Sequence, residues 1–183
     1  MTVEYQYPKT FYNKAYGKFD LSGVYFKKII HEIANFINSS GRENLTVLDF
    51  GCGEGYLKKY CNEKKFSHKI VNYDIIQENS EVKEWQGVRF DVFVANHVFC
   101  LFTETELEDI IQKIKQINPN VEMIVGVCRA GLVNSICKTL ANQKNAHSYN
   151  RINATEEKSI LEKNFKPTGR KNVFFMTDVY KLK

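Results

Sequence analysis

The sequence has few prolines and no long apolar run, and each shortage excludes a class of protein. Three prolines and ten glycines in 183 residues rule out a collagen-like or proline-rich low-complexity chain. No stretch approaches the roughly 20 apolar residues that a transmembrane helix needs. The N-terminal residues MTVEYQYPKT also lack the apolar segment that follows the basic start of a secretory signal. We therefore expect a cytoplasmic protein without a membrane anchor.

The cysteines lack the spacing of a disulfide framework or a zinc site. There are five of them, an odd number, and no two form a C-x-x-C pair. Paired cysteines are typical of secreted domains, and clustered ones of zinc sites. The sequence therefore predicts free thiols in a reducing compartment and no metal site.

Charge of one sign is not concentrated in any block. The net charge is +5, but lysine and arginine are dispersed along the chain. The densest group consists of Lys58, Lys59, Lys64, Lys65 and Lys69. We interpret this group as a solvated face, because a nucleic-acid footprint would need a basic stripe leading to a site.

What the sequence does have is the composition of a globular protein. Apolar residues make up 43% and charged residues 26%, as in ordinary globular chains. A chain of 183 residues is long enough for one domain and short for two. We therefore expect residues 1–183 to form a single domain.

Residues 46–57, TVLDFGCGEGYL, are the most informative stretch. An apolar, β-branched run ends at Asp49 and leads into glycines at alternate positions, after which Tyr56 and Leu57 begin a helical pattern. Such glycines allow positive φ and let the backbone approach a ligand closely. The helix start that follows offers free N–H groups. The stretch predicts a strand, a tight loop and a helix that bind a small molecule.

A dinucleotide site is one candidate for this loop, and it requires G-x-G-x-x-G. The third glycine would fall where the chain has Tyr56, so the fingerprint is broken. The run VLDFGCGEG instead resembles the first motif of the class I S-adenosylmethionine-dependent methyltransferases. The resemblance implies that Asp49 and the loop residues Gly51, Cys52 and Gly53 hold the methionine part of S-adenosyl-L-methionine. A plain turn between strand and helix is the alternative.

A second acidic residue follows a second predicted strand, in KIVNYDII at residues 69–76. Asp74 comes after the glycine loop at roughly the 20-residue spacing that places a carboxylate beside a ribose. In the family an acid at this strand end binds the cofactor ribose, so the resemblance assigns Asp74 and the neighbouring Ile75 to the cofactor. An aspartate in an ordinary turn is the alternative.

The next stretch departs from the family pattern. The family usually fits a helix, a strand and an acid-bearing loop around the adenine, whereas residues 75–89 are short and contain no aspartate. We consider an edge strand near residues 82–85. Trp85 would either stack on the adenine or pack against the sheet, and Glu84 or Gln86 would meet the adenine amino group.

Residues 90–95, FDVFVA, read as a strand buried on both faces of a parallel sheet. Asn96 and His97 follow it and should emerge at the same edge as Gly51 and Asp74, because ligands bind at the carboxyl ends of such strands. The stretch resembles the family's fourth strand, which places Asn96 at the cofactor. His97 has the pKa range of a general base and is the candidate catalytic residue; a packed histidine is the alternative.

The remaining elements complete an alternating pattern. Helices are predicted from Leu21 to Ile37, after the capping box Thr103 to Glu106, and after Asn153. A strand is predicted at residues 121–127, and two β-rich pieces lie near 165–168 and 173–182. This alternation favours an α/β, doubly wound and mostly parallel sheet with helices on both faces, and the resemblance adds a Rossmann-like methyltransferase fold with an antiparallel C-terminal hairpin.

Two segments suit the acceptor side of such a site. Residues 1–20 are rich in aromatics and are interpreted as an arm or a lid. Residues 129–151 are the least regular part of the chain and resemble the family's variable substrate-binding insert. Loops at the carboxyl ends of strands commonly carry specificity.

The resemblance implies methyl transfer, and three hypotheses follow. The compact chain favours a small-molecule acceptor. An RNA or protein acceptor is the second hypothesis, and a non-catalytic S-adenosylmethionine-binding protein is the third. No Asn-Pro-Pro-Tyr segment follows the fourth strand, where Ala95 to Val98 stand instead, which argues against adenine N6 methylation.

Overall fold

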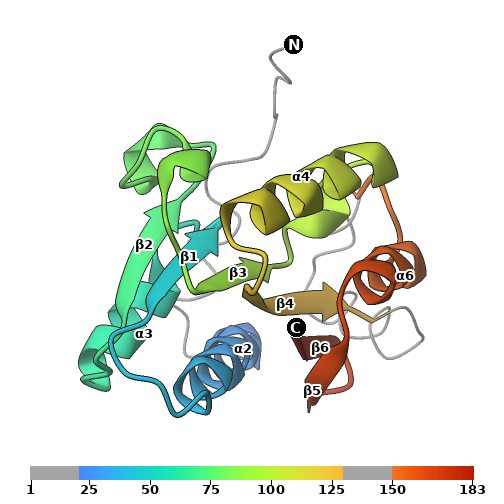
Figure 1. Ribbon diagram of the computed structural model, residues 1–183. Helices are drawn as coiled ribbons and strands as arrows, with labels where there is room; N and C mark the ends of the chain where they lie inside the picture. Colours follow the sequence, from blue (N-terminus) through green and yellow to red (C-terminus); the bar gives the residue numbers. More distant parts are fainter. Residues whose placement is uncertain (1–20, 130–149) are drawn as a thin grey trace.

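The computed structural model describes residues 21–129 and 150–183. Within these residues six strands form one sheet in the order β2-β1-β3-β4-β6-β5 (Figure 1). The strands are β1 Thr46–Phe50, β2 Lys69–Tyr73, β3 Val92–Asn96, β4 Glu122–Cys128, β5 Pro167–Val173 and β6 Thr177–Leu182. The first four are parallel, while β6 runs antiparallel to β4 and to β5. The predicted fold class, including the antiparallel hairpin, is confirmed.

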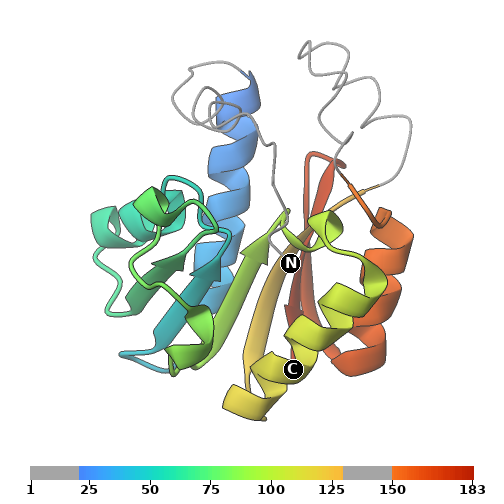
Figure 2. The same ribbon diagram turned by 90° about the horizontal axis from the view of Figure 1, so that it is seen from above.

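Helices cover both faces of the sheet (Figure 2). Helices α2 (Leu21–Asn38) and α3 (Tyr56–Glu63) pack on one face, and α4 (Glu104–Ile117) and α6 (Ala154–Asn164) on the other. Side chains alternate between the faces along each strand, so each strand contributes to two apolar layers. The predicted arm at residues 1–20 and the insert at 129–151, apart from its ends, lie outside the described residues.

The helices of the second face begin at the capping boxes read from the sequence. In α4, the Thr103 hydroxyl accepts from the Glu106 N–H, and the Glu106 carboxylate accepts from the Thr103 N–H. Asn153 and Glu156 form the same reciprocal pair in front of α6. Each box satisfies backbone donors that have no partner inside the helix.

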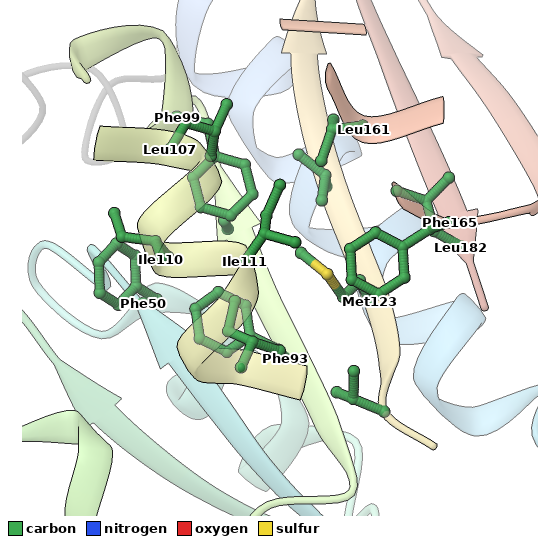
Figure 3. Packing of buried hydrophobic residues seen from close by; sticks show 14 of the residues in the cluster. Phe50, Phe93, Phe99, Leu107, Ile110, Ile111, Met123, Leu161, Phe165 and Leu182 are labelled. Carbon is green, nitrogen blue, oxygen red and sulfur yellow. The ribbon is translucent and has the colours of Figure 1, made fainter. Parts of the chain in front are cut away.

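An aromatic and aliphatic core lies between the sheet and α4 (Figure 3). Phe50, Phe93 and Phe99 lie with their ring centroids 5.3 to 6.4 Å apart. Trp85 is 4% exposed and meets the rings of Phe50 and Phe93 edge to face. Trp85 is thus a core residue, and the interpretation that it covers an adenine is not supported.

The connection from β2 to β3 contains two short 3-10 helices, Gln77–Asn79 and Trp85–Gly87, and no strand. The edge strand considered near residues 82–85 is therefore wrong. Glu81 takes its place: its N–H donates to the Asn72 carbonyl at 3.0 Å, and its carboxylate accepts from the Asn72 N–H at 3.0 Å. Lys58 on α3 pairs with the same carboxylate. Glu81 thus occupies both backbone groups of Asn72 at the outer edge of β2.

The turn of the C-terminal hairpin lies between Val173 and Thr177, later in the chain than the predicted gap at residues 169–172, because the turn has no glycine to mark it. The Met176 N–H donates to the Val173 carbonyl at 3.0 Å, and the two residues between them, Phe174 and Phe175, have φ of 50° and 59°. The Asn172 side chain accepts from the Phe175 N–H at 2.9 Å. Both phenylalanines are exposed. Type I′ turns have positive φ at both central positions and prefer Asn-Gly there.

Among the helices of the described residues, none is both long and apolar enough to cross a membrane.

Candidate active site

The glycine loop follows β1 at the carboxyl edge of the sheet. The N–H groups of Gly51 and Cys52 both donate to the Tyr73 carbonyl at the end of β2, at 2.8 and 3.1 Å. Gly51 has φ of 73°, and a Cβ there would lie 2.4 Å from Val98 Cγ2. Both the backbone conformation and the close packing therefore require glycine at this position.

Asp74 links the loop to the end of β2. One carboxylate oxygen accepts from the Gly53 N–H at 2.9 Å, and the other accepts from the Ile76 N–H at 2.9 Å. Each oxygen of an ionised carboxylate can accept a further bond, so two ligand hydroxyls fit the remaining lone pairs. Ile75, the next residue, is 57% exposed and offers an apolar surface beside the carboxylate.

Asp49 is buried at the end of β1. It shares a strand face with Val47, which packs in the layer beneath α2. Burial, and then the charge of Asp74, raise the pKa of Asp49 to about 7. No described residue donates a hydrogen bond to its carboxylate. A buried carboxylate without a donor is stabilised by a cation.

Asn96 ends β3 and faces the same layer as Asp49. Its side-chain oxygen is buried and has no donor among the described residues. A Cβ on the neighbouring Gly126 of β4 would lie 2.3 Å from this oxygen, so glycine leaves the space that the amide occupies. Asp49 and Asn96 thus place two hydrogen-bond acceptors without donors among the described residues on the same face of the sheet, near the ends of β1 and β3.

His97 follows at the rim with φ of 58°. Its N–H donates to the Gly126 carbonyl at 2.9 Å, and its Nε2 lies 2.9 Å from the Thr177 hydroxyl. The Cys128 sulfur lies 3.8 Å from each ring nitrogen. The backbone and the ring are therefore both held in place beside the ends of β4 and β6.

Cys52 lies inside the loop, with its thiol 3.5 Å from the Gly53 and Asn79 carbonyls. Burial, and then the charges of Asp49 and Asp74, raise the pKa of the Cys52 thiol. The thiol therefore stays protonated at neutral pH, and the thiolate that a nucleophile or metal ligand needs is not formed. The described residues contain no group of three or more His, Cys, Asp or Glu side chains that could hold a metal ion.

The sequence-predicted residues thus converge: Asp49, the glycine loop, Asp74, Ile75, Asn96 and His97 all lie at the carboxyl edge of β1, β2 and β3. Sequence reasoning missed Asn72 and Thr177. Asn72 stands two residues before Asp74 and therefore on the same strand face, where its amide lies under Gly55. That spacing could have indicated it, whereas no local signal indicates that Thr177 contacts His97.

This fold and this site together define a Rossmann-like, class I methyltransferase. A family model described as a methyltransferase domain matches residues 23–156, most of the chain. The chain belongs to this family of methyltransferase domains. No curated protein sequence matches it.

Solved structures show the same fold at low sequence identity. The magnesium protoporphyrin IX methyltransferase of Synechocystis PCC 6803, crystallised with S-adenosylhomocysteine, is 12% identical with a TM-score of 0.59 over 93% of this chain and 91% of its own. The 1,6-didemethyltoxoflavin-N1-methyltransferase of Burkholderia thailandensis is 15% identical, with a TM-score of 0.59 over 84% of this chain and 77% of its own. The small RNA methyltransferase HEN1 is 13% identical, with a TM-score of 0.62 over 86% of this chain and 25% of its own.

Proposed function

We propose that this enzyme transfers the methyl group of S-adenosyl-L-methionine to a small-molecule acceptor. The observation that carries the proposal is the pair of unpaired acceptors near the carboxyl ends of β1 and β3. The residue Asp49 is 5% exposed and receives no hydrogen bond from a described residue, and the buried Asn96 side-chain oxygen has no donor among the described residues. S-adenosylmethionine brings an ammonium group and a cationic sulfonium, whereas a dinucleotide would bring a pyrophosphate beside Asp49 and Asp74. A buried anion favours the cationic ligand.

The proposed placement of the cofactor follows from these contacts. Asp49 and Asn96 would accept from the methionine ammonium group, while the backbone of residues 51–53, including Cys52, lies against the methionine chain. Asp74 would accept from the ribose hydroxyls, and the exposed Ile75 side chain would pack on the adenine ring. Two of the structural relatives named above were crystallised with S-adenosylhomocysteine, which supports S-adenosylmethionine as the cofactor.

The bound cofactor would supply an electrophilic methyl group on its sulfonium. The protein's part is to hold the acceptor in line with that group, and proximity and orientation can contribute up to about 7–11 kcal/mol. A hydroxyl acceptor must also lose a proton, and we assign this step to His97, which lies beside Asn96 at the rim.

We also propose that residues 1–183 form one domain and that segments 1–20 and 129–151 lie toward the acceptor.

The positions of the lysines support a small acceptor over a nucleic acid. Lys58 pairs with Glu81 and Lys59 lies over the Tyr56 ring. Lys69 begins β2 at the amino edge of the sheet, opposite the glycine loop. The basic group therefore leads away from the rim at Asn96.

Four described cysteines are free thiols, which supports a cytoplasmic location.

Calorimetric titration with S-adenosylmethionine and, separately, with NAD tests the proposal. We expect micromolar binding of the former alone. Asp74→Ala should weaken it by about ten- to a hundredfold, because a charge-assisted hydrogen bond contributes about 1.5–3 kcal/mol. Asp91→Ala is the matched control, since Asp91 accepts from the Thr46 N–H at 2.9 Å at the amino edge of the sheet. Binding of neither ligand, or of NAD alone, would overturn the assignment.

A further inference from the structure

Glu81 connects β2 to α3, the helix that follows the glycine loop. Its N–H donates to the Asn72 carbonyl at 3.0 Å, and one of its carboxylate oxygens accepts from the Asn72 N–H at 3.0 Å. The other carboxylate oxygen pairs with the Lys58 ammonium group on α3. Glu81 thus binds the backbone of β2 and, through its side chain, the helix into which the loop leads.

Asn72 lies directly beneath the end of this loop. A Cβ on Gly55 would lie 2.5 Å from the Asn72 Nδ2 atom, and Gly55 caps α3 with φ of 70°. Asn72 is 9% exposed, and its side-chain oxygen is buried without a hydrogen-bond partner among the described residues. Packing and the two backbone bonds to Glu81, rather than a bond to that oxygen, therefore hold Asn72 under the loop.

Asp74 stands two residues after Asn72 and shares its strand face. A rise of about 3.3 Å per strand residue places the two residues about 6–7 Å apart. The Asp74 carboxylate accepts from the Gly53 N–H at 2.9 Å. A shift of β2 relative to α3 would therefore change two contacts with the glycine loop, one at Gly53 and one at Gly55.

The Glu81 carboxylate is ionised at neutral pH. Burial alone would raise its pKa, but the Lys58 ammonium group and the Asn72 N–H hold the pKa of Glu81 below its usual range. Both side chains of the ion pair are partly exposed, and ion pairs in contact with water contribute little. A hydrogen bond from a backbone N–H to a carboxylate contributes more. We therefore expect the bond to Asn72 to carry most of the effect of Glu81.

We propose that Glu81 is a positioning residue for the cofactor site, because it holds β2 and α3 in the arrangement that the glycine loop needs to bind S-adenosyl-L-methionine. This inference rests on the proposed function, in which the loop and Asp74 bind the cofactor. Glu81 acts on the site through Asn72 and Lys58. Its bonds lie where they are most needed, since β2 is the outermost strand on its side of the described sheet.

Calorimetric titration of the full chain with S-adenosylhomocysteine tests the inference, because this ligand binds without reacting. Glu81→Ala removes the carboxylate and keeps the backbone N–H. We expect it to weaken binding by about three- to thirtyfold, as is typical of residues that act on a site without contacting the ligand. Glu81→Gln keeps an acceptor oxygen for the Asn72 N–H and should restore most of the affinity. Lys58→Met removes only the ion pair and should weaken binding less than Glu81→Ala does.

Amide hydrogen exchange of the free protein separates positioning from a general loss of stability. In Glu81→Ala we expect faster exchange at Asn72, which loses its acceptor, and at Gly53, whose N–H donates to Asp74. The amides of β4, which is paired on both sides, should keep their wild-type rates. Equal acceleration in β4 would show that Glu81 only stabilises the fold, and it would overturn the inference.

Glu108→Ala is the matched control. Glu108 on α4 pairs with Lys163 on α6 at 2.9 Å, so it also joins two helices or strands by a Lys–Glu ion pair, but on the other face of the sheet from α3. Its loss should leave the affinity for S-adenosylhomocysteine unchanged. An unchanged affinity in Glu81→Ala would overturn the inference and leave the proposed function standing. Absence of binding by the wild type would overturn the proposed function, and the inference with it.

Discussion

At the scale of single residues, Asp49 couples proton binding to ligand binding. The folded protein raises its pKa to about 7, compared with about 3.9 in an unfolded chain. The native state therefore binds the proton more tightly, and the associated stability is present below about pH 4 and lost as the pH rises through 7. A cationic ligand has the opposite preference and favours the ionised carboxylate. Asp74 and the Cys52 and Cys61 thiols are the other titratable groups that face Asp49.

We accordingly expect affinity for S-adenosylmethionine to rise between pH 6 and pH 8. Below the pKa each pH unit should change the dissociation constant by up to about tenfold, and the effect should level off above it. Calorimetry at three pH values in wild type and Asp49→Asn measures this dependence. The variant should bind more weakly and with little dependence on pH. An equal slope in both proteins would exclude Asp49 as the origin.

Single residues also mark the limit of what the sequence predicts. The glycine loop and Asp74 could be predicted from the sequence, because their residue types form a short motif and one strand-helix-strand unit fixes the spacing between them. Thr177 lies 80 positions from His97 and meets it only through the register of β4 and β6. Trp85 was ambiguous because an indole suits both a core and a ligand face.

At the scale of elements, the β5–β6 turn conflicts with its own sequence. Phe174 and Phe175 both adopt positive φ, which costs an L-residue with a bulky side chain roughly 1–2 kcal/mol. The double variant Phe174→Asn, Phe175→Gly should therefore be more stable than the wild type by about 1–2 kcal/mol. Urea denaturation followed by circular dichroism measures the difference.

The control for this turn is the double alanine variant. It removes both exposed rings and keeps two non-glycine residues at positive φ, so it should show little of the gain. If both double variants were stabilised equally, removal of exposed aromatic surface would explain the effect instead of backbone strain.

The same turn shows why the hairpin was misplaced from the sequence. Turns are recognised by glycine, asparagine and proline at the strained positions, and a Phe-Phe pair reads as the interior of a strand. The starts of α4 and α6 were easier to predict, because the capping boxes at Thr103 and Asn153 mark them by a specific pair of reciprocal hydrogen bonds. No strand forms near residues 82–85, where the chain instead enters the 3-10 helix Trp85–Gly87 and buries the Trp85 ring.

At the scale of the whole molecule, one buried acid on α6 makes the free energy of unfolding depend on pH on the alkaline side. Glu157 on α6 is 2% exposed, and one of its carboxyl oxygens has no partner among the described residues. Burial raises the pKa of Glu157 to about 8. Because the folded pKa lies above the unfolded one, this contribution to stability is full below about pH 4 and is lost as the pH rises through 8.

Glu157→Gln should therefore flatten the stability curve on the alkaline side. From pH 7 to pH 9.5 we expect the wild type to lose about 1–2 kcal/mol of unfolding free energy that the variant retains. Glu162→Gln on the same helix is the control, because Glu162 is exposed and pairs with Lys158 at 3.6 Å. Thermal melts across this pH range measure the difference, and parallel curves for wild type and Glu157→Gln would contradict the expectation.

The overall architecture was predictable because apolar periodicity and alternating elements determine the layers. The strand order around β1 follows from right-handed crossovers and short connections. Periodicity could not reveal the two hydrogen bonds by which Glu81 occupies the Asn72 backbone at the outer edge of β2.

The way in which Glu81 closes β2 has a consequence for the behaviour of the protein at high concentration. An uncovered strand edge is a template onto which another chain can add, and proteins blunt such edges to avoid aggregation. At β2 the Asn72 backbone groups are occupied by Glu81. At the opposite margin, β5 carries Pro167, an irregular register at Gly169 and the charged Arg170 and Lys171. Both outer strands of the sheet thus carry features that disfavour the addition of another strand.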